Sequence, residues 1–246
     1  MLWITHQATM FNIFKHNETT KEALKHSKYF VYIACMFVAV LVISNTTAVK
    51  MVQLGFFTVS GATIIFPLSY IFGDVLTEVY GYAASRRMIW AGFFAVILMA
   101  FCYWIVQILP GASFWTNQSA YEAILGSTPR IVFASVTAFF AGEFCNSYVL
   151  SRLKVIMKGK QLWVRTISST IVGEGVDTIL VYLIAFGGVI PLSEMWVVIL
   201  SAYTLKVLIE ILFTPITYFI IGKLKKLEGI DVYDTHVDYN PFKLTE

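Results

Sequence analysis

The chain has 246 residues, of which 58% are hydrophobic and only 13% are charged, and its formal net charge is +3. A mean hydropathy of +0.72 lies far above that of a water-soluble domain of this size, so a soluble globular fold is excluded. The small net charge, carried by short basic clusters between apolar runs, also argues against a nucleic-acid-binding surface.

Six apolar stretches approach the length of about 20 residues that a helix needs to cross a bilayer core. They are predicted at 29–49, 59–80, 88–109, 129–150, 166–188 and 196–221. The second and fifth stretches are less apolar than the others because each contains two acidic residues, so hydropathy alone would return four spans. Length and loop charge favour six, and the sequence predicts an all-α integral membrane protein, a bundle of about six transmembrane helices.

The basic residues are distributed very unevenly between the two sides that six spans create. All Lys and Arg residues except Lys50, Arg130 and Lys206 fall in segments on the side of the two termini. Because cytoplasmic loops carry an excess of Lys and Arg, both termini are expected in the cytoplasm. The expected organisation is a cytoplasmic amino-terminal segment 1–28, a six-helix transmembrane domain 29–222 and a cytoplasmic tail 223–246, whose polar composition predicts weak order in part.

Ionisable residues occur inside the predicted spans, where a centrally placed charge costs about 2.5 to 3.5 kcal/mol if it faces lipid. They are Asp74, Glu78, Glu143, Glu174, Asp177, Lys206 and Glu210. One lysine can hold one of these acids in a structural ion pair, but six acids remain poorly matched by a single base. We therefore expect the acids to face a shared polar cavity.

Helical spacing gathers these residues on one polar stripe in each of four spans. The stripes contain Tyr70, Asp74, Thr77 and Glu78; Glu143, Asn146 and Ser147; Glu174 and Asp177; and Lys206 and Glu210. Carboxylates accept hydrogen bonds, so such a cavity suits a donor-rich or cationic small molecule. A simple cation pathway would use the same acids and stays open as an alternative.

Patterns typical of enzymes are missing from the sequence. His6, His16, His26 and His236 lie outside the predicted spans, and neither an HExxH nor a GxSxG motif occurs. The three cysteines form no CxxC pair, and there is no GxxxxGK[ST] loop for binding ATP. We therefore predict no catalytic residue, no metal site and no cofactor, and expect energy to come from a gradient or from a partner ATPase.

Four motifs point to a known family. They are Ile43-Ser44-Asn45 with Lys50, the run from Pro67 to Gly81 followed by Arg86, the segment Gly142-Glu-Phe-Cys-Asn-Ser147, and the segment Gly173-Glu-Gly-Val-Asp-Thr178. Together they resemble the queuosine precursor transporter family, formerly described as vitamin uptake transporters. The resemblance extends from about residue 29 to residue 226.

The resemblance implies a multi-pass inner-membrane carrier that imports 7-deazaguanines for tRNA modification, such as 7-cyano-7-deazaguanine, its aminomethyl derivative or queuine. Carried over by motif, the expected substrate-binding residues are Asn45, Tyr70, Asp74, Glu78, Asn146, Glu174 and Asp177. The cost of burial adds Lys206, Glu210 and Glu143 as candidates for coupling or charge pairing. The expected partners are this small molecule and membrane lipid, without nucleic acid.

Other readings stay open at this point. The chain could be the substrate-binding membrane subunit of an ATPase-driven vitamin importer, since such subunits are also small six-helix proteins. An assembly protein without a ligand is a third reading, which a ligand-dependent change in thermal stability would argue against. Proton coupling and a homodimer are compatible with the sequence but do not follow from it.

Overall fold

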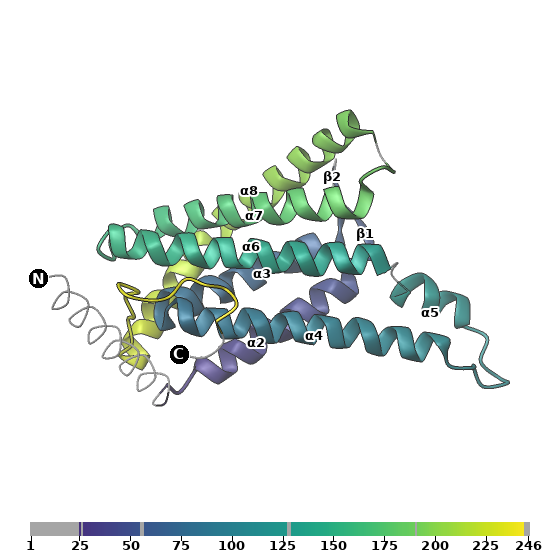
Figure 1. Ribbon diagram of the computed structural model, residues 1–246, viewed down its shortest axis with the longest axis horizontal. Helices are drawn as coiled ribbons and strands as arrows, with labels where there is room; N and C mark the ends of the chain where they lie inside the picture. The colour runs from purple at the N-terminus through teal and green to yellow at the C-terminus, as the bar shows by residue number, and fades with distance from the viewer. Residues whose placement is uncertain (1–24, 26, 55–56, 127–128, 190, 244–246) are drawn as a thin grey trace, which may run out of the picture.

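The computed structural model describes residues 25, 27–54, 57–126, 129–189 and 191–243. In that part of the chain the structure is a bundle of long helices with one short hairpin (Figure 1). The elements are α2 (Phe30–Thr47), β1 (Met51–Leu54), β2 (Phe57–Ser60), α3 (Gly61–Val75), the π-helix η1 (Leu76–Tyr80), α4 (Tyr82–Ile108), α5 (Gln118–Leu125), α6 (Pro129–Ile156), α7 (Leu162–Phe186) and α8 (Leu192–Glu228). Most of the predicted amino-terminal segment, residues 1–24 and 26, lies outside the described residues.

Within the described residues, six helical segments are long and apolar enough to cross a membrane. The six spans are α2, α3 with η1, α4, α6, α7 and α8, and they confirm the predicted membrane bundle. Burial supports lipid surroundings, because Asp74 and Glu143 are completely buried while Phe101 and Leu212 are 53% and 74% exposed. Lipid can cover apolar side chains but cannot solvate charge. The acids therefore lie inside the bundle and large apolar side chains lie on its surface, the reverse of a water-soluble protein.

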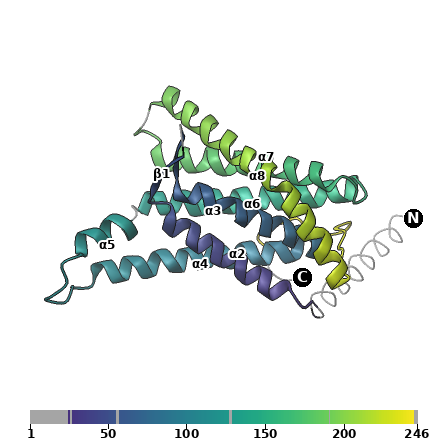
Figure 2. The same cartoon turned by 180° about the vertical axis from the view of Figure 1, so that it is seen from behind.

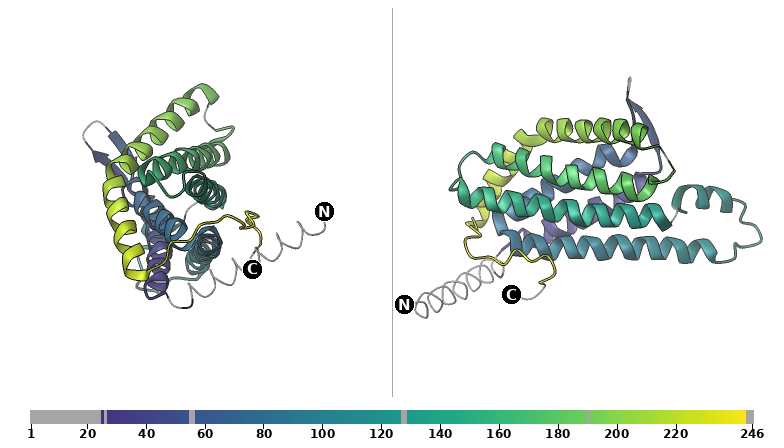
Figure 3. Two further views of the ribbon diagram at one scale, coloured as in Figure 1. Left: turned by 90° about the vertical axis from the view of Figure 1, so that its left-hand side faces the viewer. Right: turned by 45° about the horizontal axis from the view of Figure 1, so that its top comes forward.

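The helices surround α3, which is the most buried span together with η1. Helices α6 and α7 run side by side, and α4 packs against α6 (Figures 1 and 3). On the other side of the bundle α2 packs against α3, and the long α8 crosses over α3 and α7 (Figure 2). Side chains from α3 therefore meet α2, α6 and α8.

Two connections differ from the sequence prediction. The residues 81–87 do not form a loop, because α4 begins at Tyr82 and only Gly81 separates it from η1. Gly81 has φ 86°, a left-handed conformation that glycine adopts without strain. The link between α2 and α3 contains the antiparallel hairpin β1–β2, and the Oγ atom of Ser60 then caps α3 by accepting from the backbone N–H of Ala62.

The tail after α8 packs on the bundle, so the prediction of weak order in this segment is wrong for its described residues. The carboxylate of Asp234 accepts hydrogen bonds from the backbone N–H of Tyr82 at 2.9 Å and from Ser151 at 2.6 Å. Arg86 is buried and donates to the carbonyl oxygens of Asp238 and Asn240 at 2.7 and 3.0 Å. The tail thus supplies an acid to the N-terminus of α4, where an unpaired N–H and the helix dipole favour one.

The beginning of α2 and the end of α8 meet at the same end of the bundle. The carboxylate of Glu228 accepts hydrogen bonds from the hydroxyl of Ser27 and the backbone N–H of Tyr29, at 2.8 and 2.7 Å. The basic side chains of Lys154, Arg165 and Lys225 gather here, so we call it the basic end. The hairpin and α5 lie at the opposite end (Figure 1).

Helices α6 and α7 approach closely because glycines face each other between them. A Cβ atom added to Gly142 would lie 2.8 Å from the Cβ of Asp177 and 2.9 Å from the carbonyl oxygen of Gly173. A Cβ atom added to Gly173 would lie 2.7 Å from the Cβ of Asn146 and 2.9 Å from the carbonyl oxygen of Gly142. The small residues let the two backbones touch, as is common between membrane helices.

We expect Gly142→Ala to lower the free energy of unfolding by about 1 to 3 kcal/mol, because the added methyl group has no room and forces the helices apart. Gly222→Ala on α8 is the matched control, since its Cβ would meet no described atom within 4 Å. Thermal unfolding of both purified variants in detergent measures the difference. Equal melting temperatures would contradict the close packing of α6 on α7.

Candidate functional site

Five acids from four helices converge in the middle of the bundle. They are Asp74 on α3, Glu143 on α6, Glu174 and Asp177 on α7, and Glu210 on α8, and we call them the central acidic cluster. Each is at most 5% exposed. Glu143 interacts electrostatically with the other four acids, so the predicted convergence of these side chains is what the structure shows.

Asp74 and Asn146 form the contact between α3 and α6 within the cluster. The amide nitrogen of Asn146 donates to Oδ1 of Asp74 at 2.9 Å, and both side chains are completely buried. The second oxygen of Asp74 and the carbonyl oxygen of Asn146 have no hydrogen-bond partner among the described residues. Since a buried acceptor without a donor is costly, these atoms are candidates to meet a ligand.

Lys206 on α8 neutralises the α7 side of the cluster. Its ammonium group lies 2.6 Å from Asp177 and 2.9 Å from Glu174, so one cation bridges two acids one helical turn apart. It also lies 4.6 Å from the centre of the Phe66 ring on α3, a favourable position for a cation over an aromatic face. Lys206 is the cation of the cluster within the described part of the chain.

Glu143 and Glu210, like Asp74, have carboxylate oxygens without a hydrogen-bond partner among the described residues. Neither carboxylate oxygen of Glu143 has a hydrogen-bond partner among the described side chains and backbone. The Oε1 atom of Glu210 also lacks a partner there. Tyr70 lies beside them, fully buried, and interacts electrostatically with both of these acids and with the α7 acids. Gly73 makes room for Glu143, because a Cβ there would lie 2.9 Å from Oε2 of Glu143.

Asn45 lies away from the cluster. Its side chain donates to the backbone oxygen of Leu41 and accepts from Ser135 on α6, at 2.9 and 3.1 Å. Ser135 and Asn146 are separated by about 16 Å along α6, at 1.5 Å per residue. The structure therefore places Asn45 nearer to the end of the bundle that carries the hairpin.

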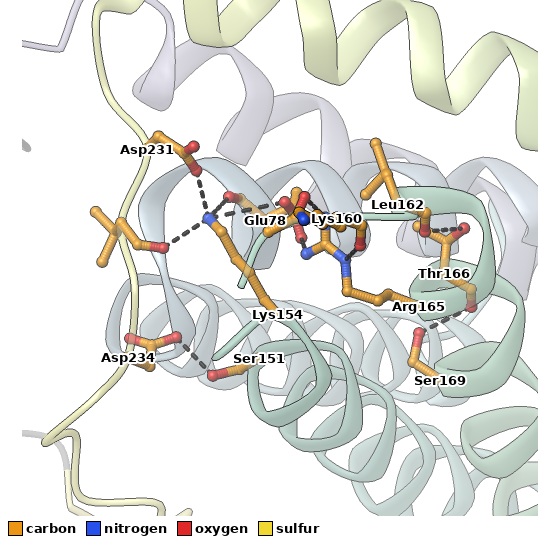
Figure 4. A network of polar contacts seen from close by, with 12 residues as sticks. Glu78, Ser151, Lys154, Lys160, Leu162, Arg165, Thr166, Ser169, Asp231 and Asp234 are labelled. Atoms are coloured by element: carbon orange, nitrogen blue, oxygen red, sulfur yellow. Dashed lines mark hydrogen bonds and ion pairs between the residues drawn. The ribbon is translucent and has the colours of Figure 1, made fainter. Parts of the chain in front are cut away.

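Glu78 belongs to a second network, at the basic end (Figure 4). Its two oxygens lie 2.6 Å from the guanidinium of Arg165 and 2.7 Å from the ammonium of Lys225, and the ammonium of Lys154 is 3.7 Å away. Glu78 is completely buried, so these cations compensate its loss of hydration. The structure separates Glu78 from the other predicted substrate-binding acids.

The tail completes this second network. Lys154 donates to the carboxylate of Asp231, to the backbone oxygen of Val232 and to the backbone oxygen of Glu78. Lys225 lies 2.9 Å from Asp231 as well. In the sequence, Lys154, Arg165 and Lys225 indicate only topology, although the position of Glu78 near the basic end of its span is a signal that it meets them.

Stability should depend on pH through Asp231. Partial burial acts to raise the pKa of Asp231, but hydrogen bonds and charge from Lys154 and Lys225 outweigh it and lower the pKa below its ordinary value. A carboxyl group whose pKa is lowered on folding stabilises the protein at pH values above its unfolded-state pKa, near 3.9. This contribution is lost as the pH falls through the folded-state pKa.

We therefore expect Asp231→Asn to be less stable than the natural protein near pH 7, by about 1 kcal/mol or less because the carboxylate is 41% exposed. The difference should shrink as the pH falls below about 4. Thermal unfolding between pH 3 and 7 measures it, and Glu194→Gln, an exposed position at the opposite end, serves as the control. A difference that stays constant with pH would contradict the ion pairs.

A cavity of about 580 Å³ lies near the opposite end of the bundle and not at the central acidic cluster. Lys50, Ile64 and Ile124 are among its lining residues, and its surface is almost entirely apolar. Among the described residues, no group of three or more His, Cys, Asp or Glu side chains could hold a metal ion. The polar chemistry of the bundle is concentrated in the two networks.

Comparison with known proteins agrees with this architecture. Residues 60–220 match the family model described as "Putative vitamin uptake transporter". A Bacillus subtilis (strain 168) protein named "Probable queuosine precursor transporter" is 30% identical over 179 residues, which cover 72% of this chain and 78% of that protein. The "Queuosine precursor transporter" of Escherichia coli (strain K12) is 29% identical over 163 residues, which cover 65% and 71%.

No solved structure matches the chain. The family match includes every residue of the central acidic cluster and also Glu78, Arg165 and Lys206. The family is named for transport and not for catalysis, in keeping with a bundle of six spans around buried acids. The chain therefore belongs to the queuosine precursor transporter family and is a multi-pass transporter of the inner membrane.

Proposed function

We propose that this chain imports 7-deazaguanine precursors of queuosine as a secondary carrier, and that the central acidic cluster binds them. The observation that supports the proposal most directly is the set of buried acceptor atoms on Asp74, Asn146, Glu143 and Glu210 without a partner among the described residues. The names of the relatives supply the substrate class.

The chemistry of the ligand fits the cluster. A 7-deazaguanine has adjacent N–H donors on its six-membered ring and a carbonyl group beside them. Carboxylates accept from such donors, and the second N–H of the Asn146 amide can donate to a carbonyl while the first stays on Asp74. The ring of Tyr70 provides a flat apolar surface for the heterocycle.

Proton coupling is part of the proposal. Glu210 on α8 lies 2% exposed, with one oxygen that has no partner among the described residues, and an acid in such surroundings is suited to bind and release a proton. Lys206, bound between Glu174 and Asp177, would offset the charge of the α7 acids meanwhile. We also propose that both termini lie in the cytoplasm. The excess of basic residues on their side supports this orientation, and the contact of Ser27 with Glu228 supports a common side for both.

Uptake by the purified protein in lipid vesicles tests the proposal. We expect labelled 7-cyano-7-deazaguanine to accumulate when the vesicle interior is alkaline, and an ionophore that collapses the pH gradient to stop accumulation. Guanine, thiamine and riboflavin serve as competitors. Uptake that requires co-expressed ATPase subunits, or a preference for a vitamin, would favour the binding-subunit alternative instead.

A further inference from the structure

Helices α6 and α7 carry the same short pattern of residues. In α6 it reads Gly142-Glu143-Phe-Cys-Asn146-Ser147, and in α7 it reads Gly173-Glu174-Gly-Val-Asp177-Thr178. In both, a glycine is followed by a glutamate, then after two residues by Asn or Asp, and then by a hydroxyl side chain. The two copies lie in consecutive helices that run side by side (Figure 3).

The contact between the two copies is reciprocal. The glycine of α6 faces Asp177, four residues after the glycine of α7, and the glycine of α7 faces Asn146, four residues after the glycine of α6. The corresponding distances to an added Cβ are 2.8 and 2.7 Å, and the distance to the opposing glycine carbonyl is 2.9 Å in both directions. Such matched contacts are those of two antiparallel helices related by a local twofold axis, an arrangement that recurs in carriers built from inverted repeats.

The two copies have different partners. In the α7 copy, the ammonium of Lys206 is bound between Glu174 and Asp177 at 2.9 and 2.6 Å. In the α6 copy, both oxygens of Glu143 and the carbonyl oxygen of Asn146 lack a hydrogen-bond partner among the described residues. Both side chains are completely buried. The α6 copy therefore offers three buried acceptors without a partner among the described residues, where the α7 copy binds a donor group of the protein itself.

We propose that Glu143 and Asn146 are the half of the site that binds the hydrogen-bond donor edge of the ligand. Glu143 accepts from two adjacent N–H groups of a flat heterocycle, in the way that Glu174 and Asp177 accept from Lys206. Glu143 is then the specificity-determining residue for a ligand with an exocyclic amino group next to a ring N–H. The inference rests on the proposed function and adds to it the residue that recognises the donor edge of the ligand.

The other acids of the cluster are less suited to this role. Asp74 is bound by Asn146, and Glu174 and Asp177 are bound by Lys206. Glu143 is the acid of the cluster whose two oxygens are both buried and unpartnered within the described part of the chain. A bidentate contact needs both oxygens of one carboxylate.

Binding of two ligands to three proteins tests the assignment. The ligands are 7-cyano-7-deazaguanine and the analogue that lacks the 2-amino group, and the proteins are the natural chain, Glu143→Gln and the twofold-related control Glu174→Gln. We expect removal of the amino group to weaken binding to the natural chain by about 10- to 100-fold, as for a charge-assisted hydrogen bond. Glu143→Gln should bind the parent compound more weakly by a similar factor and no longer distinguish the two ligands, while Glu174→Gln still distinguishes them.

The outcomes separate the two proposals. If the natural chain binds no 7-deazaguanine, the proposed function fails and this inference with it. If the natural chain distinguishes the two ligands and Glu143→Gln distinguishes them equally well, only the assignment of Glu143 fails. Binding that requires sodium in the natural chain and loses this requirement in Glu143→Gln would also overturn it, because Glu143 would then bind a cation.

Folding of the variants is checked on the same samples. Thermal unfolding shows whether Glu143→Gln retains the native fold, and Glu143→Asp provides a second variant that keeps the charge. We expect Glu143→Asp to bind the parent compound more weakly and still to prefer it over the analogue. Equal binding of both ligands by Glu143→Asp, with the natural chain preferring the parent, would contradict a role for the charge.

Discussion

Substrate uptake is expected to fall by about 100-fold when Asp177 is replaced by Asn. The ammonium of Lys206 lies 2.6 Å from this carboxylate, and the bridge between Glu174 and Asp177 depends on both negative charges. Removing one charge weakens a charge-assisted hydrogen bond by about 1.5 to 3 kcal/mol and releases Lys206 toward the other acids. Initial rates of uptake in lipid vesicles measure the loss.

Asp238→Asn is the matched control for Asp177→Asn. The same chemical change is made there in the tail, where the carboxylate is exposed and accepts from Lys243 at 3.2 Å. We expect it to leave uptake unchanged. Membrane insertion and thermal unfolding should be close to those of the natural chain for both variants, and unaltered uptake by Asp177→Asn would remove Asp177 from the site.

Stability is expected to fall by about 3 to 5 kcal/mol when Glu78 is replaced by Gln, the loss typical of breaking a buried ion pair. Glutamine keeps the volume of the side chain but leaves Arg165, which is 1% exposed, without its counter-ion, and leaves Lys154, also 1% exposed, with Asp231 alone. Lys225 loses the same partner. For a chain of this size the melting temperature should fall by about 10 °C.

Two further variants make this prediction specific. Glu210→Gln, in the central acidic cluster, removes a carboxylate with an oxygen unpartnered within the described chain and should change the melting temperature little. The double variant Glu78→Gln with Arg165→Met should recover part of the loss, because one buried charge is removed with the other. A Glu78→Gln protein that keeps its stability and loses only uptake would return Glu78 to the substrate-binding residues.

The two networks divide the buried charges into different roles. At the basic end, Glu78 is surrounded by cations from α6, α7 and α8, and the tail adds Asp231 (Figure 4). In the centre, Lys206 pairs with two of the five acids, Glu174 and Asp177. At the basic end, paired charges hold helices together, whereas in the centre several acceptor atoms have no partner among the described residues. We therefore expect Glu78→Gln to act on stability and Asp177→Asn to act on uptake.

The basic residues of the chain therefore serve two purposes. Their uneven distribution predicts which end faces the cytoplasm. Several of them, including Arg86 and Arg165, are also buried and hydrogen-bonded. In the sequence these two arginines count as loop charges, but in the structure their side chains lie inside the bundle.

Much of this protein follows from its sequence alone. Span length and loop charge together predict six spans, because the bilayer thickness is fixed, a helix rises 1.5 Å per residue and basic loops lie on one side. The cost of burying charge shows that the acids must face the interior, and helical periodicity predicts which of them share a face. From these local rules, Asp74, Glu174 and Asp177 are predicted to be among the converging residues.

Only the tertiary structure separates Glu78 from Asp74, although both lie on the same face of the second span. The helical rise places Glu78 one turn nearer the basic end, and whether an acid there meets cations or a ligand depends on how α6, α7 and the tail pack. Asn45 is likewise placed by its contact with Ser135. The reciprocal glycine contact of α6 and α7 was also decided by packing, because a short repeated pattern gains its meaning only when the two helices touch.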